Sequence, residues 1–139
     1  MAHIPIGTTS TRISYTATSG QTAFTIPFEY FAQSDIKVYQ EGTLLTITTH
    51  YTISDNTTYT GGFDGGTVTL VTGATLNDEV VIALDMVTER TTDFPTSGAF
   101  NIDTLNTWID KMILFFKQAF EEIDRKVGRP VTSTETYSL

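Results

Sequence analysis

The chain has 139 residues, a formal net charge of −8 and no cysteine. This length is enough for one domain with a sizeable core, and the acidic balance argues against a nucleic-acid or anionic-membrane partner, because both need clustered Lys and Arg. Without cysteine, the chain has no disulfide framework, zinc–thiolate site or thiol nucleophile. The N-terminal residues do not fit a signal peptide, and no stretch approaches the ~20 apolar residues of a membrane span.

Threonine makes up about a fifth of the chain, whereas Lys and Arg together number only eight. A composition rich in Thr and poor in Lys suits exposed β-surface, because the branched side chain fits a pleated strand and its hydroxyl stays hydrated. Residues 1–11 show no periodicity and are predicted to form an extended arm. A free arm would be disordered, and in an assembly it could lie over a neighbouring chain.

The first strand is predicted to begin at Arg12, where apolar Ile13, Tyr15 and Ala17 alternate with polar residues. This alternation is the period of a half-buried strand. A turn at residues 19–21 and a second alternating segment at 23–26 together predict a β-hairpin. Pro27 should end the second strand, because proline cannot donate to a ladder.

Short strands are also predicted beyond the aromatic residues 28–31. They comprise residues 36–40, 43–47, 51–53, 67–71 and 79–84. A tight turn at Glu41 and Gly42 should join the first two as an antiparallel pair, and the glycine-rich residues 55–66 should form an irregular loop or a hairpin tip. Residues 79–84 are apolar on both faces, which predicts a central strand.

A long amphipathic helix is predicted at residues 101–127. Asn101 should cap its N-terminus, because the side-chain carbonyl can accept a hydrogen bond from a free amide of the first turn. Gly128 followed by Pro130 predicts its end.

Apolar side chains lie on one line of this helix at the heptad spacing of a coiled-coil seam. This line comprises Leu105, Ile109, Met112, Phe116, Ala119 and Ile123. Trp108 and Phe115 flank it on one shoulder, and Ile113 and Phe120 flank it on the other. The apolar arc spans roughly 160°, wider than the ~100° of a surface helix. We therefore expect one shoulder to pack on the helix's own domain and the seam to pack on copies of the chain. In the simpler alternative, the helix only covers the sheet of its own monomer.

A run of strands followed by one helix predicts a mainly β fold: an antiparallel β-sandwich or barrel-like domain followed by one long C-terminal amphipathic α-helix. The expected organisation is an arm at residues 1–11, a β-rich domain at 12–98, a helix at 99–128 and a polar tail at 129–139.

Catalytic constellations are weak in this sequence, which predicts no enzyme activity, metal site or cofactor. His3 and His50 are the only histidines, and neither has a companion at metal-ligand spacing. A glycosidase pair could be sought among the carboxylates Asp78, Glu79, Asp85, Glu89 and Asp93, although solvated turn and strand-edge carboxylates are the favoured interpretation. Asp55, Asn56 and Asp64 supply oxygen ligands of the kind that calcium takes, but their spacing fits no known calcium loop.

Four blocks of the sequence follow one another in a characteristic order: residues 24–31 (FTIPFEYF), residues 36–38 (IKV), residues 45–47 with Tyr51, and residues 87–94 followed by Gly98, Leu105 and Asn106. In order and spacing, these blocks resemble the N-terminal domain of phage T7-type tail fibres. The resemblance covers about residues 12–125. Where the family usually has an acidic residue before the tyrosine of the third block, this chain has His50.

The resemblance implies a virion structural protein of a short-tailed phage. Such a domain attaches a homotrimeric fibre or tailspike to the adaptor and nozzle proteins of the tail, and its helix begins the trimeric shaft. Family fibres usually continue into a long shaft and a receptor-binding tip, whereas this sequence ends at Leu139. We therefore expect either that a separate protein supplies the distal fibre or tailspike, or that the chain is a minimal fibre. It would be made in the host cytoplasm and reside in the phage tail.

Side chains are expected to divide between two roles under this hypothesis. The expected trimer interface comprises Leu105, Ile109, Met112, Phe116 and Ile123. The expected packing of the helix on its domain involves Trp108 and Phe115 against Phe28, Tyr30 and Phe31. The alternative function is a non-catalytic carbohydrate-binding β-module in which Tyr39, Tyr59 or Phe63 stacks on sugar. A sugar-cleaving enzyme that uses Asp85 or Glu89 is a third hypothesis.

Overall fold

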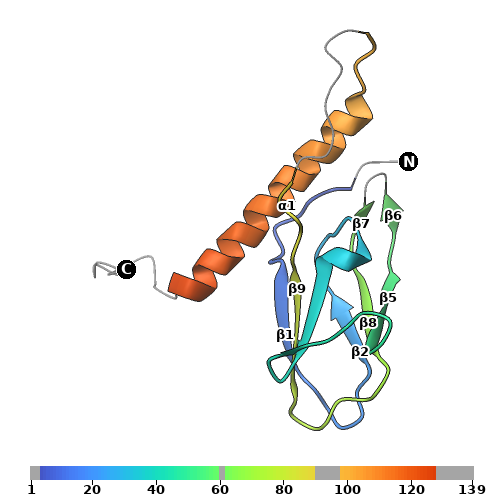
Figure 1. Ribbon diagram of the computed structural model, residues 1–139, viewed down its shortest axis with the longest axis vertical. Helices are drawn as coiled ribbons and strands as arrows, with labels where there is room; N and C mark the ends of the chain where they lie inside the picture. The colour runs from blue at the N-terminus through green and yellow to red at the C-terminus, as the bar shows by residue number, and fades with distance from the viewer. Residues whose placement is uncertain (1–3, 60–61, 90–97, 128–139) are drawn as a thin grey trace.

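The computed structural model describes residues 4–59, 62–89 and 98–127. The predicted fold class is confirmed, because two antiparallel sheets pack as a sandwich and one long helix follows them (Figure 1). The four-stranded sheet has the order β1 (Arg12–Thr16), β9 (Glu79–Leu84), β3 (Ile36–Gln40) and β4 (Thr43–Leu44). The three-stranded sheet has the order β2 (Ala23–Ile26), β8 (Gly66–Leu70) and β5 (Tyr51–Asp55). The strands β6 (Thr58–Tyr59) and β7 (Gly62–Phe63) form a small ribbon, and the 3-10 helix η1 (Gln33–Asp35) precedes β3.

The core lies between the two sheets and follows the alternation of their strands. Phe24 and Ile26 of β2 are buried while their neighbours in the strand are exposed. The strand β9 lies between β1 and β3, as its apolar sequence predicts, and Val80 and Ile82 are fully buried. Two hydrogen bonds from tyrosine side chains to backbone carbonyls also join the sheets. The Tyr15 hydroxyl donates to the Thr25 carbonyl at 2.7 Å, and the Tyr51 hydroxyl donates to the Ile36 carbonyl at 3.2 Å.

The tight turn between β3 and β4 forms as predicted. Glu41 and Gly42 both have positive φ, 51° and 79°, which matches the twist of a two-residue hairpin. The returning strand ends at Leu44 and not at residue 47, because the chain then turns. The amide of Thr46 donates to His50 Nδ1 at 2.9 Å, and Thr48 also has a positive φ.

The predicted hairpin between residues 12–17 and 23–26 is wrong. The turn exists, but β1 pairs with β9 and β2 pairs with β8, so the chain passes from one sheet to the other at this turn. The loop that connects β8 to β9 makes the same passage beside it, and the two loops exchange hydrogen bonds between Gly20 and Ala74 and between Ala74 and Gln21. The turn residues alone do not predict this pairing, because β9 and β8, the partners of β1 and β2, are distant in sequence.

The expectation of a free N-terminal arm is also wrong for residues 4–11. Ile4 is only 3% exposed and Thr11 only 1%. The Gly7 amide donates to Glu29 Oε1 at 2.7 Å, and the Thr11 carbonyl accepts from the Leu84 amide at 2.9 Å. This segment therefore belongs to the β-domain.

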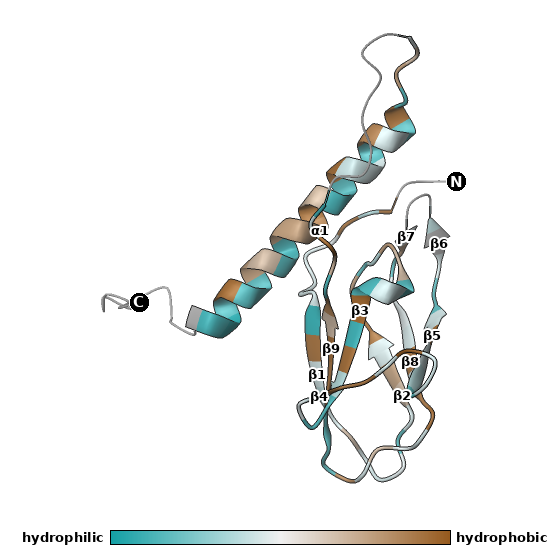
Figure 2. Ribbon diagram, in the orientation of Figure 1, coloured by the Kyte–Doolittle hydropathy of each residue, from teal (hydrophilic) through white to brown (hydrophobic). Residues whose placement is uncertain are grey.

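The helix α1 (Ile102–Val127) has the predicted length and N-cap. Asn101 Oδ1 accepts from the Thr104 amide at 3.1 Å, while the expected stop at Gly128 and the polar tail lie outside the described residues. The helix runs obliquely beside the four-stranded sheet and extends beyond the sandwich (Figure 1). Apolar and polar segments alternate along its length (Figure 2).

Candidate assembly surface

One side of α1 carries an apolar surface that remains exposed in the part of the chain that the structure describes. Its large apolar side chains are between 41% and 63% exposed. They are Ile102, Ile109, Met112, Ile113, Phe116, Phe120 and Ile123, and we call them the apolar face. The rings of Phe116 and Phe120 stack with centroids 6.4 Å apart. A soluble chain rarely exposes so many contiguous apolar side chains without a partner.

The opposite side of α1 attaches the helix to the sandwich. Leu114 is fully buried and belongs to the core cluster. One turn further along, Gln118 is 8% exposed, and its Oε1 accepts from the Met86 amide at 2.9 Å. The Lys117 Nζ lies 3.3 Å from Glu29 Oε2, and Arg12 Nε lies 3.8 Å from Glu121 Oε1. At ~100° per residue, Leu114 and Gln118 point away from the apolar face.

Sequence patterns do not predict this attachment, because the side of the helix that forms it mixes apolar and polar residues. Leu114 has polar residues one turn away on both sides, Lys111 and Gln118, so no apolar stripe marks this side of the helix. A Gln that completes a buried hydrogen bond looks like any solvated Gln in a sequence. Without knowledge of Met86, whose amide needs an acceptor, no signal could have identified it.

The residues predicted to form the trimer seam have two environments. Ile109, Met112, Phe116 and Ile123 lie in the apolar face, whereas Leu105 is half-buried. Of the residues predicted to pack the helix on its domain, Phe28 and Tyr30 lie fully inside the sandwich. Phe31, Trp108 and Phe115 are half-buried, and they lie together at the junction of α1 with the domain.

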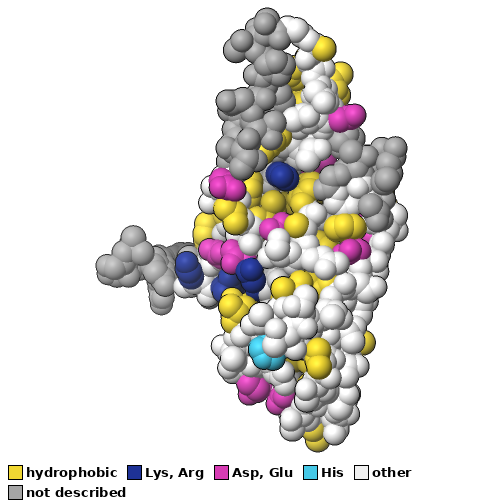
Figure 3. Space-filling view, turned by 45° about the vertical axis from the view of Figure 1, so that its right-hand side comes forward, with side chains coloured by type: hydrophobic (Ala, Val, Ile, Leu, Met, Phe, Trp, Pro, Cys, Tyr) yellow, Lys and Arg dark blue, Asp and Glu magenta, His cyan; other side chains and the backbone are white. Residues whose placement is uncertain are grey.

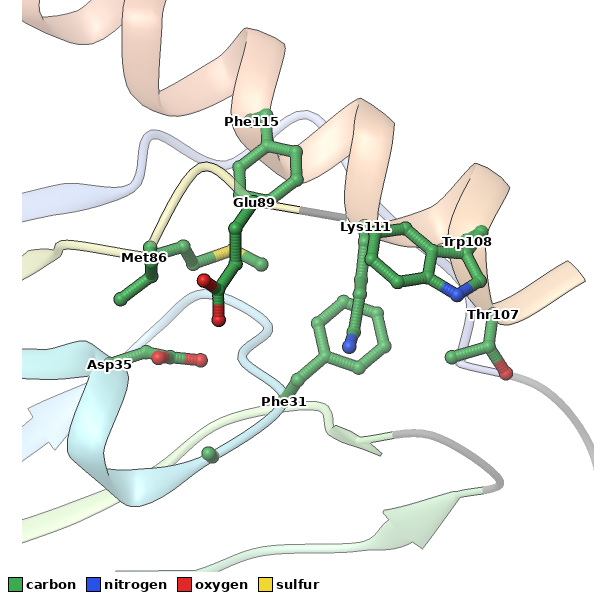
Figure 4. Close-up of a pocket in the computed structure, with 10 residues that line it drawn as sticks. Phe31, Asp35, Met86, Glu89, Thr107, Trp108, Lys111 and Phe115 are labelled. Atoms are coloured by element: carbon green, nitrogen blue, oxygen red, sulfur yellow. The ribbon is translucent and has the colours of Figure 1, made fainter. Parts of the chain in front are cut away.

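A hollow of about 490 Å³ occupies this junction, between α1, residues 86–89, the two residues before η1 and Asp35 at the end of η1. Lys111 extends between two rings, its Nζ 4.8 Å from the centroid of Trp108 and 5.6 Å from that of Phe31 (Figure 4). Both distances suit cation–π attraction. The carboxylates of Asp35 and Glu89 point into the same hollow (Figure 4), and the space-filling view shows hydrophobic side chains gathered around a basic one (Figure 3).

An adjoining hollow of about 380 Å³ extends this space toward the apolar face. Its lining comprises Thr88, Glu89, Trp108, Met112 and Phe115. Glu89, Trp108 and Phe115 line both hollows, so together they form one open groove along the helix. We call it the α1 groove. Because Met112 belongs both to the groove and to the apolar face, the two surfaces are continuous.

Several of the residues weighed for catalysis or metal binding form hydrogen bonds within the domain. Across residues 4–59, 62–89 and 98–127, no group of three or more His, Asp or Glu could hold a metal ion. Asp55 accepts from the Tyr30 hydroxyl at 2.5 Å and from Gln33 Nε2 at 2.8 Å, and Asp64 Oδ1 accepts from the Thr57 amide at 3.0 Å. His3 and Asp93 lie outside the described residues.

Glu79 and Asp85, two of the carboxylates considered for a glycosidase pair, lie too far apart to form one. Six residue steps of extended chain place them ~20 Å apart, whereas such pairs lie roughly 5–10 Å apart. The Asp78 carboxylate instead caps a turn, where its Oδ2 accepts from Gln40 Nε2 at 2.7 Å and from the Thr75 amide at 3.0 Å.

The aromatic residues considered for sugar stacking do not form one platform. Tyr39 lies on β3 opposite Leu44 of β4, and β4 and the β6–β7 ribbon lie at opposite ends of the sandwich (Figures 1 and 2). Phe63 packs its ring against buried Tyr30, with centroids 5.3 Å apart.

Comparison with known proteins adds no relative: no protein-family model matches the chain, and no curated protein matches it. Within the part of the chain that the structure describes, no helix is long and apolar enough to cross a membrane.

Proposed function

We propose that this chain is a non-enzymatic structural protein of a short-tailed phage, which attaches a homotrimeric fibre or tailspike to the virion tail. The observation that carries the assembly part of the proposal is the apolar face of α1. The opposite side of the same helix is held on the sandwich by Leu114, Gln118 and Lys117, so in the described part of the chain the apolar face points away from the domain. This exposure supports burial of the face by another copy of the chain.

The apolar face fits a self-associating helix because its residues keep the heptad spacing of a coiled coil. A two-stranded seam is narrow and uses little more than the two apolar positions of each heptad. Here Ile113 and Phe120 widen the surface on one side of the seam, and both are exposed. A wider apolar surface is better covered by two neighbouring helices than by one, which favours a trimer.

The attachment role comes from the sequence resemblance and agrees with the shape of the molecule. The sandwich is a compact body, and α1 extends past it (Figure 1). In a parallel trimer, three helices would form the beginning of a shaft, and three sandwiches would surround it and contact the tail. The sandwich and its docked N-terminal segment would then bind the adaptor and nozzle proteins, while the helical end would connect to the distal fibre or spike.

The solution mass of the protein tests the assembly part. Multi-angle light scattering should give three times the chain mass of 15.3 kDa. Met112→Asp or Phe116→Asp should reduce it to one chain mass, because either change places an unpaired carboxylate in the buried seam. Leu76→Asp is the matched control: Leu76 is 58% exposed on the sandwich, and its replacement should leave the trimer intact. A monomeric wild-type protein, or trimers that persist in both seam variants, would contradict the proposal.

The composition of the virion tests the attachment part. Mass spectrometry of purified phage particles encoded by the same genome should detect this chain, and antibody-gold labelling should locate it at the tail. If the chain is trimeric but absent from purified particles, the assembly part stands and the attachment part is wrong.

A further inference from the structure

We infer that the α1 groove is the docking site for the neighbouring copy's α1, which inserts Ile113 and Phe120 beside Trp108 and Phe115. The trimer would then close as a ring of three identical contacts between parallel helices in register. This inference rests on the proposed trimer and specifies which surfaces of two copies meet.

The positions of these side chains in the heptad support the pairing. With heptad positions lettered a to g, the seam places Ile109, Phe116 and Ile123 at a and Leu105, Met112 and Ala119 at d. Trp108 and Phe115 are then g residues, and Ile113 and Phe120 are e residues. Parallel helices in register place each g residue beside the e residue of the next heptad in the neighbour, and these flanking positions determine partner and orientation. Trp108 therefore meets Ile113, and Phe115 meets Phe120.

The g and e flanks of the seam have different surroundings, and this difference favours a contact between the g flank of one copy and the e flank of the next. The g flank lies next to the domain and forms the lining of the α1 groove together with Thr88 and Glu89. The e flank is more open among the described residues, where Ile113 is 41% exposed and Phe120 is 63% exposed. In an antiparallel pair, e would face e and g would face g, so the groove would meet another groove. Only the parallel arrangement places the exposed apolar flank of one copy against the groove of the next.

Continuity with the seam strengthens the argument. Met112 is a d residue and also lines the groove, so a neighbour packed on the seam already touches the groove's edge. Insertion of apolar side chains would remove water from the half-buried rings of Trp108 and Phe115. Each closed contact would then combine seam, groove and domain residues, which couples the position of the sandwich to the helical shaft.

Cysteine cross-linking tests this arrangement cleanly, because the natural chain has no cysteine. The double variant Phe115→Cys with Phe120→Cys should give covalent trimers on oxidation, as should Trp108→Cys with Ile113→Cys. The register control, Phe115→Cys with Ile113→Cys, should not, because its two positions belong to different pairs. Within one helix, neither pair can close on itself, because the two side chains point to different sides. Efficient covalent dimers from Phe115→Cys or Phe120→Cys alone would indicate antiparallel packing and overturn the inference.

Light scattering under reducing conditions separates the two possible failures. If reduced variants are trimers and the in-register pairs do not cross-link, the groove inference is wrong and the proposed trimer stands. If wild-type protein is a monomer at every concentration, both are wrong. Trp108 is the only tryptophan, so wild-type fluorescence provides a readout free of substitutions. Its emission should shift to the blue as one chain mass becomes three, and trimer formation without a shift would contradict insertion beside Trp108.

Discussion

Leu114 is the side chain through which α1 enters the core of the sandwich. It is fully buried, whereas the preceding residue, Ile113, is 41% exposed and points away from the domain. Two adjacent apolar residues of similar size thus have opposite environments. Substitution of each residue therefore separates the contribution of domain packing to stability from the contribution of assembly.

Leu114→Ala should lower the free energy of unfolding by about 2–5 kcal/mol, the cost of removing a buried leucine and leaving a cavity. Ile113→Ala should lower it by under about 1 kcal/mol when measured at concentrations that keep the chain monomeric. Urea denaturation followed by circular dichroism measures both. Equal losses in the two variants would show that the helix is not held by Leu114.

Asp35 is a second residue whose environment affects stability. Burial raises the pKa of its carboxyl above the ordinary value of 3.8, and the nearby charge of Asp85 adds to this, although a hydrogen bond from the Ala32 backbone and the charges of Lys111 and Lys37 act in the opposite direction. An acid with a raised pKa in the folded state binds its proton more tightly there than in the unfolded chain. Its contribution to stability therefore falls as the pH rises from about the unfolded value through the folded one.

Asp35→Asn should consequently raise the free energy of unfolding more at pH 7 than at pH 3. At pH 3 the wild-type carboxyl is mostly protonated in both the folded and the unfolded state. The folded protein then buries little carboxylate charge, so the substitution has little destabilisation to remove. Urea midpoints of variant and wild type at the two pH values provide the measurement. A variant that is less stabilised at pH 7 than at pH 3 would reverse the expected sign.

At the scale of elements, Glu29 joins three parts of the chain. Its Oε1 accepts from the Gly7 amide at 2.7 Å, and its Oε2 lies 3.3 Å from Lys117 Nζ on α1. The side chains of Glu29 and Lys117 are only 11% and 16% exposed. A buried carboxylate in this position ties the N-terminal segment, the loop after β2 and the helix together, and loss of either partner leaves a charge poorly solvated.

Lys117→Met should lower the free energy of unfolding by about 1–3 kcal/mol, the range for a hydrogen bond to a charged group. Glu29→Gln should have a similar effect. The double variant should cost less than the two single losses combined, because the second change removes a group that has already lost its partner. A double-mutant cycle by thermal denaturation measures this coupling. Strictly additive losses would mean that the two side chains do not interact in solution.

At the scale of the whole molecule, the proposed trimer would link stability to assembly. The sandwich supplies its own core, while the apolar face of α1 would gain protection from water in the trimer. Anything that binds the folded state and not the unfolded chain stabilises the folded state by mass action, and here the ligand is the chain itself. Folding stability should therefore depend on protein concentration.

The midpoint of thermal unfolding should rise by roughly 5–10 °C over a hundredfold increase in wild-type concentration. In Phe116→Asp, which should stay monomeric, the midpoint should not change with concentration. Differential scanning calorimetry at several concentrations measures both. A wild-type midpoint that is independent of concentration would contradict a link between folding and assembly.

Local sequence patterns predict the features that depend on neighbouring residues. Alternation predicted the strands, the Glu41-Gly42 turn predicted one hairpin, and Asn101 predicted the start of α1. Heptad spacing identified a line of apolar residues of which Ile109, Met112, Phe116 and Ile123 lie in the apolar face. Each of these signals is local, because a strand's two faces and a helix's sides repeat within a few residues.

The contacts between segments that are distant in sequence are visible only in the folded molecule. The tertiary structure paired β1 with β9 where a hairpin with β2 was expected, docked residues 4–11 on the domain, and showed that Leu114 and Gln118 hold the helix. The physical reason is that strand pairing and buried polar contacts satisfy groups far apart in the chain, and no periodicity records such partners. The same reason explains the α1 groove, whose lining from α1 and from residues 86–89 comes together only in the folded domain.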